Sequence, residues 1–370
     1  MTVADNGPVV VPRQLEFARK TLALSRQDVA SLLNFSEQEL AAWEEGLAEP
    51  SVEVLWSLAE LYGRDVDYFV RDYGGIPSTL NFRLTVPHRL EELSVDTRHA
   101  IAEFDELCRS AREVEAVLEL QRWTPPPSYS GVSGDQVAER ERRRLGLGDR
   151  PVPDIRELVE SQQVLCFHLP VPGDEFSGLS WVHPRYGPSI LVNAGDNPGR
   201  RAFTTAHEYG HLLRRDGDSV CDIRDLDAGM AVEKQANLFA TSFLMPVSDV
   251  LTTFRRRALS SSSLGLSELA SLARRYGVSL EAMRIRLKEL DLASDEILRL
   301  RLDLPPSRYF GRPRPKWRRR LGDTVASRIM EAYANGQIST AKLAAYLGVG
   351  IRQAMDLVEP ETAVGHPPRG

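Results

Sequence analysis

The chain has 370 residues, with 46 Lys and Arg against 52 Asp and Glu, which gives a formal net charge of −6 at pH 7. This length is enough for two or three domains with their own cores, and 42% hydrophobic with 26% charged residues is typical of a globular protein. The sequence shows no signal-peptide pattern of a basic amino terminus followed by an apolar segment, and no apolar stretch is long enough to span a membrane. We therefore expect a cytoplasmic protein with no membrane association. The three widely spaced cysteines (Cys108, Cys166, Cys221) fit a reducing compartment and structural roles.

The amino-terminal part predicts a small helical domain. We expect residues 1–12 to be disordered and residues 13–73 to form five helices, because apolar residues recur at helical spacing and Ser25 and Ser36 stand at capping positions. Residues 25–51 read S-R-Q-D-V-A-S-L-L-N-F-S-E-Q-E-L-A-A-W-E-E-G-L-A-E-P-S and resemble the Cro/CI-type (XRE) helix-turn-helix. The resemblance implies that residues 36–45 enter a major groove, with Gln27 near a phosphate and Ser36 and Gln38 as further DNA contacts.

The charge of this segment departs from that pattern. Between Arg13 and Tyr68 there are five Lys and Arg against eleven Asp and Glu, and the expected recognition helix carries four acids and no basic residue (Glu37, Glu39, Glu44, Glu45). Phosphate attraction supplies most of the non-specific affinity for DNA, and an acidic face opposes it. Two interpretations therefore stay open, DNA binding and binding of a protein partner, including a second copy of the chain.

Residues 74–131 are expected to be a linker with one long helix. Gly74-Gly75-Ile76-Pro77-Ser78 marks its start, and a Pro-rich stretch near residues 123–131 marks its end. The intervening charged, amphipathic pattern near residues 89–122 predicts a helix that bridges two domains or forms a homodimer.

The most informative motif is H-E-Y-G-H at residues 207–211. Positions i and i+4 share one face of a helix, so His207 and His211 can bind one metal ion, while Glu208 can act on a water at an open metal position. A short apolar run at residues 189–193 and a turn cluster come before the motif, which predicts strand, loop and helix. Thr204, one turn earlier, is a candidate hydrogen-bond partner beside the site.

A hydrolytic zinc site needs a third protein ligand. The strongly helical segment at residues 233–246, which ends in a proline, offers Glu233, with Asn237 one turn later on the same face. Four aspartates are rival ligands in a turn-rich connection that fixes a ligand less well (Asp218, Asp222, Asp225, Asp227). We favour Glu233, with Asn237 as a hydrogen-bond partner.

Both motifs carry a family resemblance. R-A-F-T-T-A-H-E-Y-G-H-L-L and E-K-Q-A-N-L-F-A-T-S-F-L-M-P are similar to the ImmA/IrrE family of zinc metallopeptidases, over roughly residues 135–250. The resemblance implies a zincin-like domain, at residues 132–258 here, in which His207, His211 and Glu233 hold Zn²⁺ and Glu208 is the general base. It also implies a repressor-like protein as substrate.

The carboxy-terminal part is expected to be helical. We expect a helical extension at residues 259–304, a basic linker at 305–320, a helical unit with a helix-turn-helix rhythm at 321–360, and disorder at 361–370. The linker contains seven basic residues with no acid, and six of them are candidate DNA contacts (Arg312, Arg314, Lys316, Arg318, Arg319, Arg320). Interleaved aromatic residues suit base stacking, whereas the prolines favour a solvated linker.

Taken together, the sequence predicts a mostly α protein with a small β-sheet (α+β), built as a helix-turn-helix domain, a zincin-like peptidase domain and a helical carboxy-terminal region. The leading hypothesis is a regulatory zinc metallopeptidase with a DNA- or partner-binding domain. Two alternatives remain: a transcriptional regulator whose zincin domain senses or binds without turnover, and an antitoxin-like partner binder.

Overall fold

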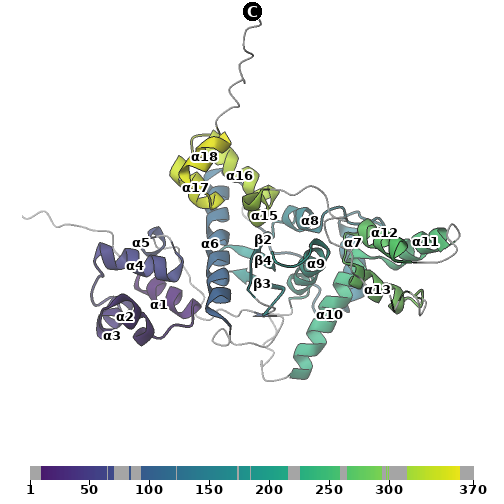
Figure 1. The fold of residues 1–370 in the computed structure, drawn as a ribbon, viewed down its shortest axis with the longest axis horizontal. Helices are drawn as coiled ribbons and strands as arrows, with labels where there is room; N and C mark the ends of the chain where they lie inside the picture. Colours follow the sequence, from purple (N-terminus) through teal and green to yellow (C-terminus); the bar gives the residue numbers. More distant parts are fainter. Residues whose placement is uncertain are drawn as a thin grey trace, which may run out of the picture.

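The computed structural model describes residues 10–64, 66–70, 83–84, 93–121, 123–172, 175–183, 185–215, 226–258, 265–293, 297, 299 and 315–358. The described part is mostly helical, with one small sheet beside a long central helix (Figure 1). This confirms the expected α+β class. Among the sequence candidates, Arg312, Arg314, Cys221 and three of the four rival aspartates lie outside the described residues.

The amino-terminal domain has the five expected helices, α1 (Pro12–Thr21), α2 (Arg26–Leu33), α3 (Glu37–Glu44), α4 (Val52–Tyr62) and α5 (Asp67–Val70). Ser25 begins α2 and Ser36 begins α3, each in a reciprocal capping box with Asp28 and Glu39 respectively. The apolar sides of the helices meet in a closed core that includes Leu15, Leu40 and Phe69.

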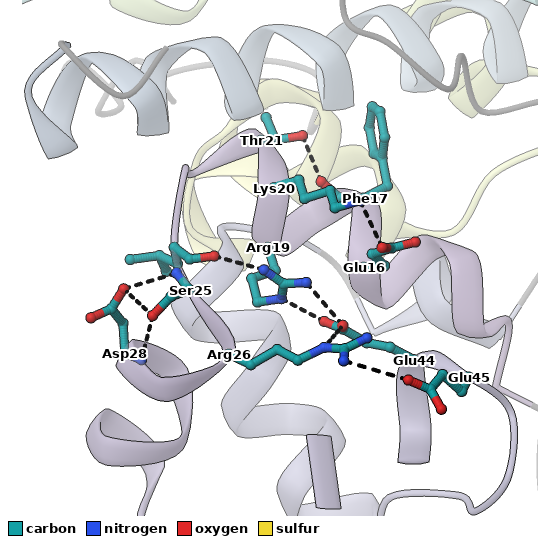
Figure 2. A network of polar contacts seen from close by, with 11 residues as sticks. Glu16, Phe17, Arg19, Lys20, Thr21, Ser25, Arg26, Asp28, Glu44 and Glu45 are labelled. Atoms are coloured by element: carbon teal, nitrogen blue, oxygen red, sulfur yellow. Dashed lines mark hydrogen bonds and ion pairs between the residues drawn. The ribbon is translucent and has the colours of Figure 1, made fainter. Parts of the chain in front are cut away.

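A buried carboxylate joins three of these helices. Glu44, at the end of α3, accepts two hydrogen bonds from Arg19 of α1, at 2.6 and 2.9 Å, and one from Arg26 of α2, at 2.8 Å (Figure 2). The Glu44 side chain has no exposed area, and a buried carboxylate is tolerated only when it is paired and hydrogen-bonded. One of the four acids on the expected recognition helix is therefore structural.

Helix α6 (Val95–Val117) connects the amino-terminal domain to the sheet (Figure 1). Its Ala102 belongs to the core of the helix-turn-helix domain, and its Asp105 lies 2.7 Å from the guanidinium of Arg64, which follows α4. Its Phe104 packs on Phe167 and Trp181 of the sheet. The long helix expected from the sequence thus bridges two parts of the same chain.

The sheet has the strand order β1-β3-β4-β2, with β1 (Arg83–Leu84), β2 (Leu165–Leu169), β3 (Gly178–His183) and β4 (Gly187–Asn193). Strands β3 and β4 are antiparallel, β2 runs parallel to β4, and β1 pairs antiparallel with β3. Side chains alternate between two faces. Leu179 and Trp181 join the core with α6, whereas Ile190 and Val192 join the core with the peptidase helices.

The second core is covered by α7 (Gly134–Arg144), α8 (Ile155–Ser161), α9 (Pro198–Arg214), α10 (Leu226–Leu244), α11 (Val247–Ala258), α12 (Leu266–Tyr276) and α13 (Leu280–Glu289). Helix α7 lies close against α10, where the Gly134 backbone N–H donates to the Gln235 side chain at 2.8 Å. A side chain at Gly134 would overlap the α10 backbone. The Tyr209 hydroxyl of α9 donates to the buried Glu141 of α7 at 2.6 Å. Together these contacts fix α9 and α10, the two helices that carry the metal candidates.

The carboxy-terminal helices are α15 (Lys316–Leu321), α16 (Asp323–Ala334), α17 (Thr340–Leu347) and α18 (Ile351–Val358), and they pack with α6 and the sheet. The range expected as a solvated basic linker therefore includes part of a helix, with Trp317 buried. Two of its basic side chains are in ion pairs, Arg320 with Glu103 at 2.7 Å and Arg318 with Asp323 at 3.2 Å. Burial of one tryptophan and two ion pairs explains why this segment is ordered. None of the helices in the described ranges is both long and apolar enough to cross a bilayer.

Candidate metal centre

Two histidines of α9 point at one place. The helix begins after Asn197, whose side chain accepts a hydrogen bond from the Arg200 backbone N–H, and Pro198 occupies its first turn. His207 and His211 lie one turn apart and are both buried, with exposed fractions of 5% and 8%. Their Nε2 atoms are 3.1 Å apart. A helical spacing of four residues thus produces the paired imidazoles that the motif predicts.

Glu233 of α10 completes a triangle with them. One carboxylate oxygen lies 3.1 Å from His207 Nε2, and the other lies 3.3 Å from His211 Nε2. Close approach of the two helices makes this possible, because Gly210 of α9 faces the Phe239 ring of α10 with no room for a side chain. These three residues form the group that could hold a metal ion within the described part of the chain.

The donor set fits zinc. Ligand atoms at roughly 2.0–2.1 Å from a tetrahedral Zn²⁺ are separated from one another by about 3.3 Å. The two Nε2 atoms are 3.1 Å apart, close to that value, and each lies 3.1 or 3.3 Å from a different oxygen of the Glu233 carboxylate. Two imidazole nitrogens and one carboxylate are also the ligand types of three-ligand hydrolytic zinc sites. The fourth tetrahedral position would remain for a water or a substrate.

Asn237 sets the orientation of one ligand. Its side-chain oxygen lies 3.0 Å from His207 Nδ1, a separation at which Nδ1–H donates to the amide oxygen. His207 Nε2 then carries the lone pair and can bind a metal. Asn237 lies one turn after Glu233 on α10, so one helix supplies both a candidate ligand and the partner that orients another.

The Glu233 carboxylate is ionised. Without a metal ion, partial burial raises the pKa of Glu233, but hydrogen bonds from His207 and His211, and the positive charge that these imidazoles carry when protonated, outweigh burial and lower the pKa to about 2. An ionised carboxylate beside two imidazoles is the protonation state that a cation requires.

Glu208 points to the sheet side of α9. It is 1% exposed, and the Ser180 hydroxyl of β3 donates to its carboxylate at 2.8 Å. Gly178 lies two residues earlier on β3, and a Cβ there would be 3.1 Å from the Glu208 carboxylate and would overlap the methyl group of Thr204. Strand β3 therefore forms the floor beneath Glu208 and Thr204. Ser180 and Gly178 could not be predicted as site residues, because they lie on β3 and reach Glu208 only through the packing of β3 on α9.

Three other polar residues near the motif have structural partners. His183 Nδ1 accepts from the backbone N–H groups of Arg185 and Tyr186, each at 3.1 Å. Arg201 donates to the carbonyl of Ala194 at 3.2 Å, and Tyr209 is bound to Glu141 as described above. The contacts of these three residues hold turns and helices together.

The candidate DNA contacts of the amino-terminal domain lie at its surface. Gln27 on α2 and Gln38 on α3 are exposed. Ser36 is exposed too, but its hydroxyl forms hydrogen bonds with Glu39 as the cap of α3. The exposed part of α3 keeps its acids, apart from the buried Glu44.

The basic candidates on α15 divide into two kinds. Arg318 and Arg320 are in ion pairs within the chain. Lys316 and Arg319 have exposed side chains. Trp317 packs into the core, which removes it as a base-stacking residue. The metal candidates therefore converge at one site, whereas the DNA candidates are spread over two distant surfaces.

Two segments of the chain match known family models. Residues 159–288 match the family model described as the IrrE N-terminal-like domain, and residues 15–69 match a helix-turn-helix model. The radiation response metalloprotease IrrE of Deinococcus radiodurans is 33% identical over 129 residues, which cover 32% of this chain and 38% of the relative. The match thus spans less than half of either protein. The two family resemblances expected from the sequence are confirmed for these segments.

Proposed function

We propose that this protein is a regulatory zinc metallopeptidase that cleaves a repressor-like protein. The observation that supports it most is the convergence of His207, His211 and Glu233, with Glu208 next to the first ligand in the sequence and buried beside β3. A purely structural zinc needs four protein ligands and no neighbouring base. Three ligands with an adjacent carboxylate match the hydrolytic arrangement.

The chemistry follows from the residues at the site. Zinc held by His207, His211 and Glu233 would supply the Lewis acidity that peptide hydrolysis needs at neutral pH. Glu208 takes a proton from the attacking water and passes it to the leaving amine. Ser180 holds the Glu208 carboxylate in one orientation, so the proton acceptor is in place before the substrate arrives.

The amino-terminal domain would direct the peptidase to its target. A helix-turn-helix is compatible with docking at a promoter, and the exposed Gln27 and Gln38 suit such a contact. A second candidate, binding of a protein partner, is favoured by exposed apolar side chains on the same domain, Leu47 at 77% and Trp56 at 63%. The surrounding acids would select a basic partner surface.

Cleavage of candidate repressors tests the proposal. Full-length protein loaded with zinc is incubated with helix-turn-helix repressors encoded near its own gene, beside Glu208→Gln as the control. We expect a discrete cleavage by the wild type and none by Glu208→Gln, although both bind zinc. Zinc binding without any Glu208-dependent cleavage would instead support a sensor or interaction module. The Glu208→Gln protein also serves to trap the substrate for identification.

A further inference from the structure

Four basic side chains gather at the β2 edge of the sheet. Helices α8 and α15 pack on β2, and α9 packs on α8 and on the neighbouring strand β4 (Figure 1). The three helices contribute Arg156, Arg201 and Arg319, and β2 contributes His168. Like charges at close range repel one another, so an assembly of this kind is favoured when an anion lies between them.

Main-chain carbonyl groups hold two of the arginines beside His168. Arg156 donates to the carbonyl of Cys166, which lies two residues before His168 on the same face of β2. Arg201 donates at 3.2 Å to the carbonyl of Ala194, which directly follows β4, the strand paired with β2. His168 therefore lies between two guanidinium groups.

The His168 ring is neutral and has an atom without a partner. Burial lowers the pKa of His168 well below its ordinary value, and the charges of Arg156 and Arg201 lower it further. Its Nε2 atom is buried and has no hydrogen-bond partner among the residues that the structure describes. Buried polar atoms are paired in most proteins, and an Nε2–H group can donate to an anion. The unpaired atom thus indicates a ligand with acceptor oxygens.

Positive charge exceeds negative charge in this cluster. Glu160 pairs with Arg156 at 2.8 Å, but no carboxylate of the described ranges lies within ion-pair distance of the Arg201 or Arg319 side chain. Burial lowers the pKa of Arg201, and the charge of the nearby Arg319 lowers it further, whereas Asp196, which is in another ion pair, has the opposite effect. Arg319 is exposed and Arg201 is partly buried, so solvent reaches the cluster from the side of α15.

We propose that His168, Arg201 and Arg319 bind a phosphate group. A guanidinium group presents a planar fork of donors that fits phosphate oxygens, and a neutral imidazole adds one more donor. Arg156 adds its charge, while its N–H groups stay bonded to Glu160 and to main-chain carbonyls. The phosphate belongs either to a DNA backbone or to free phosphate or a small phosphorylated molecule. In both cases it links α15 to the start of α9, the helix that carries the paired histidines.

Titration of the zinc-loaded, full-length protein with inorganic phosphate tests the site. Calorimetry at constant ionic strength, balanced with chloride, should detect phosphate binding. Arg201→Gln should lower the affinity by roughly tenfold, because it removes a charge-assisted hydrogen bond. Arg319→Gln should lower it by about threefold, since an exposed ion pair contributes less. Arg143→Gln removes the same charge from an exposed position on α7 and should bind phosphate like the wild type.

His168→Leu separates a specific site from a general effect of charge. The His168 ring is neutral, so this variant keeps the charge of the cluster, and replacement of an unpaired buried group by an apolar one is compatible with folding. We expect it to lower the phosphate affinity by roughly threefold or more. Circular dichroism and thermal unfolding check the fold of each variant. If Arg201→Gln does not fold, His168→Leu and Arg319→Gln decide the result.

DNA binding identifies the source of the phosphate. The anisotropy of a labelled duplex is measured over a range of salt concentrations, and again with added phosphate at constant ionic strength. If the DNA backbone supplies the phosphate, Arg201→Gln should weaken DNA binding and reduce the salt slope by about 0.9, and free phosphate should compete with the duplex. Unchanged DNA binding in Arg201→Gln, together with loss of phosphate binding, would assign the site to free phosphate or a small phosphorylated molecule.

Three results would overturn the proposal. In the first, the wild type binds neither phosphate nor DNA. In the second, the phosphate and DNA affinities of His168→Leu and Arg201→Gln equal those of the wild type, which is also the result expected if phosphate binds the zinc ion instead. In the third, Arg143→Gln loses as much affinity as Arg201→Gln.

Discussion

The Ser180 hydroxyl donates a 2.8 Å hydrogen bond to the Glu208 carboxylate, across the contact between β3 and α9. Both side chains are buried, with exposed fractions of 8% and 1%. A hydrogen bond to a charged group in such surroundings fixes its direction. The strand beneath the motif helix thus positions the residue that we propose as the proton acceptor.

Loss of this hydrogen bond should slow cleavage without releasing the metal. We expect Ser180→Ala to lower kcat/KM by about tenfold, in the range seen when a supporting hydrogen bond is removed from a metal site. Zinc content should stay the same, because Ser180 contacts none of the three candidate ligands in the described contacts. Ser161→Ala, at the surface end of α8, is the control. Wild-type kinetics of Ser180→Ala would show that Glu208 needs no support from β3.

Asn237 should affect affinity for the metal. Its oxygen accepts from His207 Nδ1 and so fixes the tautomer that leaves Nε2 free for a cation. We expect Asn237→Ala to weaken zinc binding by roughly 10- to 100-fold, measured by competition with a chromogenic chelator. Asn335→Ala, at the end of α16, should bind zinc like the wild type. An unchanged affinity in Asn237→Ala would remove Asn237 from the site.

Glu44 should stabilise the amino-terminal domain strongly. Its buried carboxylate pairs with Arg19 and Arg26 (Figure 2), so Glu44→Ala leaves a buried guanidinium without its anion and should lower the free energy of unfolding by about 3 kcal/mol. Its neighbour Glu45 is 53% exposed in a 3.4 Å pair with Arg26. Glu45→Ala should change stability by less than about 1 kcal/mol. Denaturant unfolding of both variants checks the comparison, and equal effects would contradict it.

DNA binding should depend on the exposed basic residues of α15. We expect a modest, salt-sensitive affinity that falls when Lys316 and Arg319 are replaced by Gln, because each lost phosphate contact reduces the salt slope by about 0.9. Neutralisation of all basic residues in 308–320 should lower the affinity further. Fluorescence anisotropy with duplex DNA at several salt concentrations measures both quantities. An affinity that survives these changes but disappears on deletion of residues 1–72 would assign DNA binding to the amino-terminal domain instead.

The paired histidines could be predicted from sequence because their geometry is local, whereas Glu233 joins them only through the packing of α10 on α9. His207 and His211 share a helix face by spacing alone, and Glu233 follows on the next strongly helical segment. The general fold class followed from the same periodicities. The starts of two helices were also predictable, since Ser25 and Ser36 cap α2 and α3 at the positions that the sequence pattern indicates.

The remaining features depend on contacts between distant segments. Ser180 reaches Glu208 only after β3 packs on α9. A count of acids in the amino-terminal domain cannot show that Glu44 is neutralised by two arginines. The basic run that ends at Arg320 predicts a solvated linker. In the structure, Trp317 is buried in the core and Arg320 forms an ion pair with Glu103. In each case tertiary packing decides what a charged or polar residue does.

The central claim is that His207, His211 and Glu233 hold one zinc ion, and the metal content of purified protein tests it most directly. After dialysis against a buffer that contains a trace of zinc, elemental analysis should find about one zinc ion per chain in the wild type and in Glu208→Gln. His207→Ala and Glu233→Ala should contain almost none, whereas His99→Ala on α6 should match the wild type. A wild type without zinc, or a Glu233→Ala variant that keeps its full complement, would contradict the account.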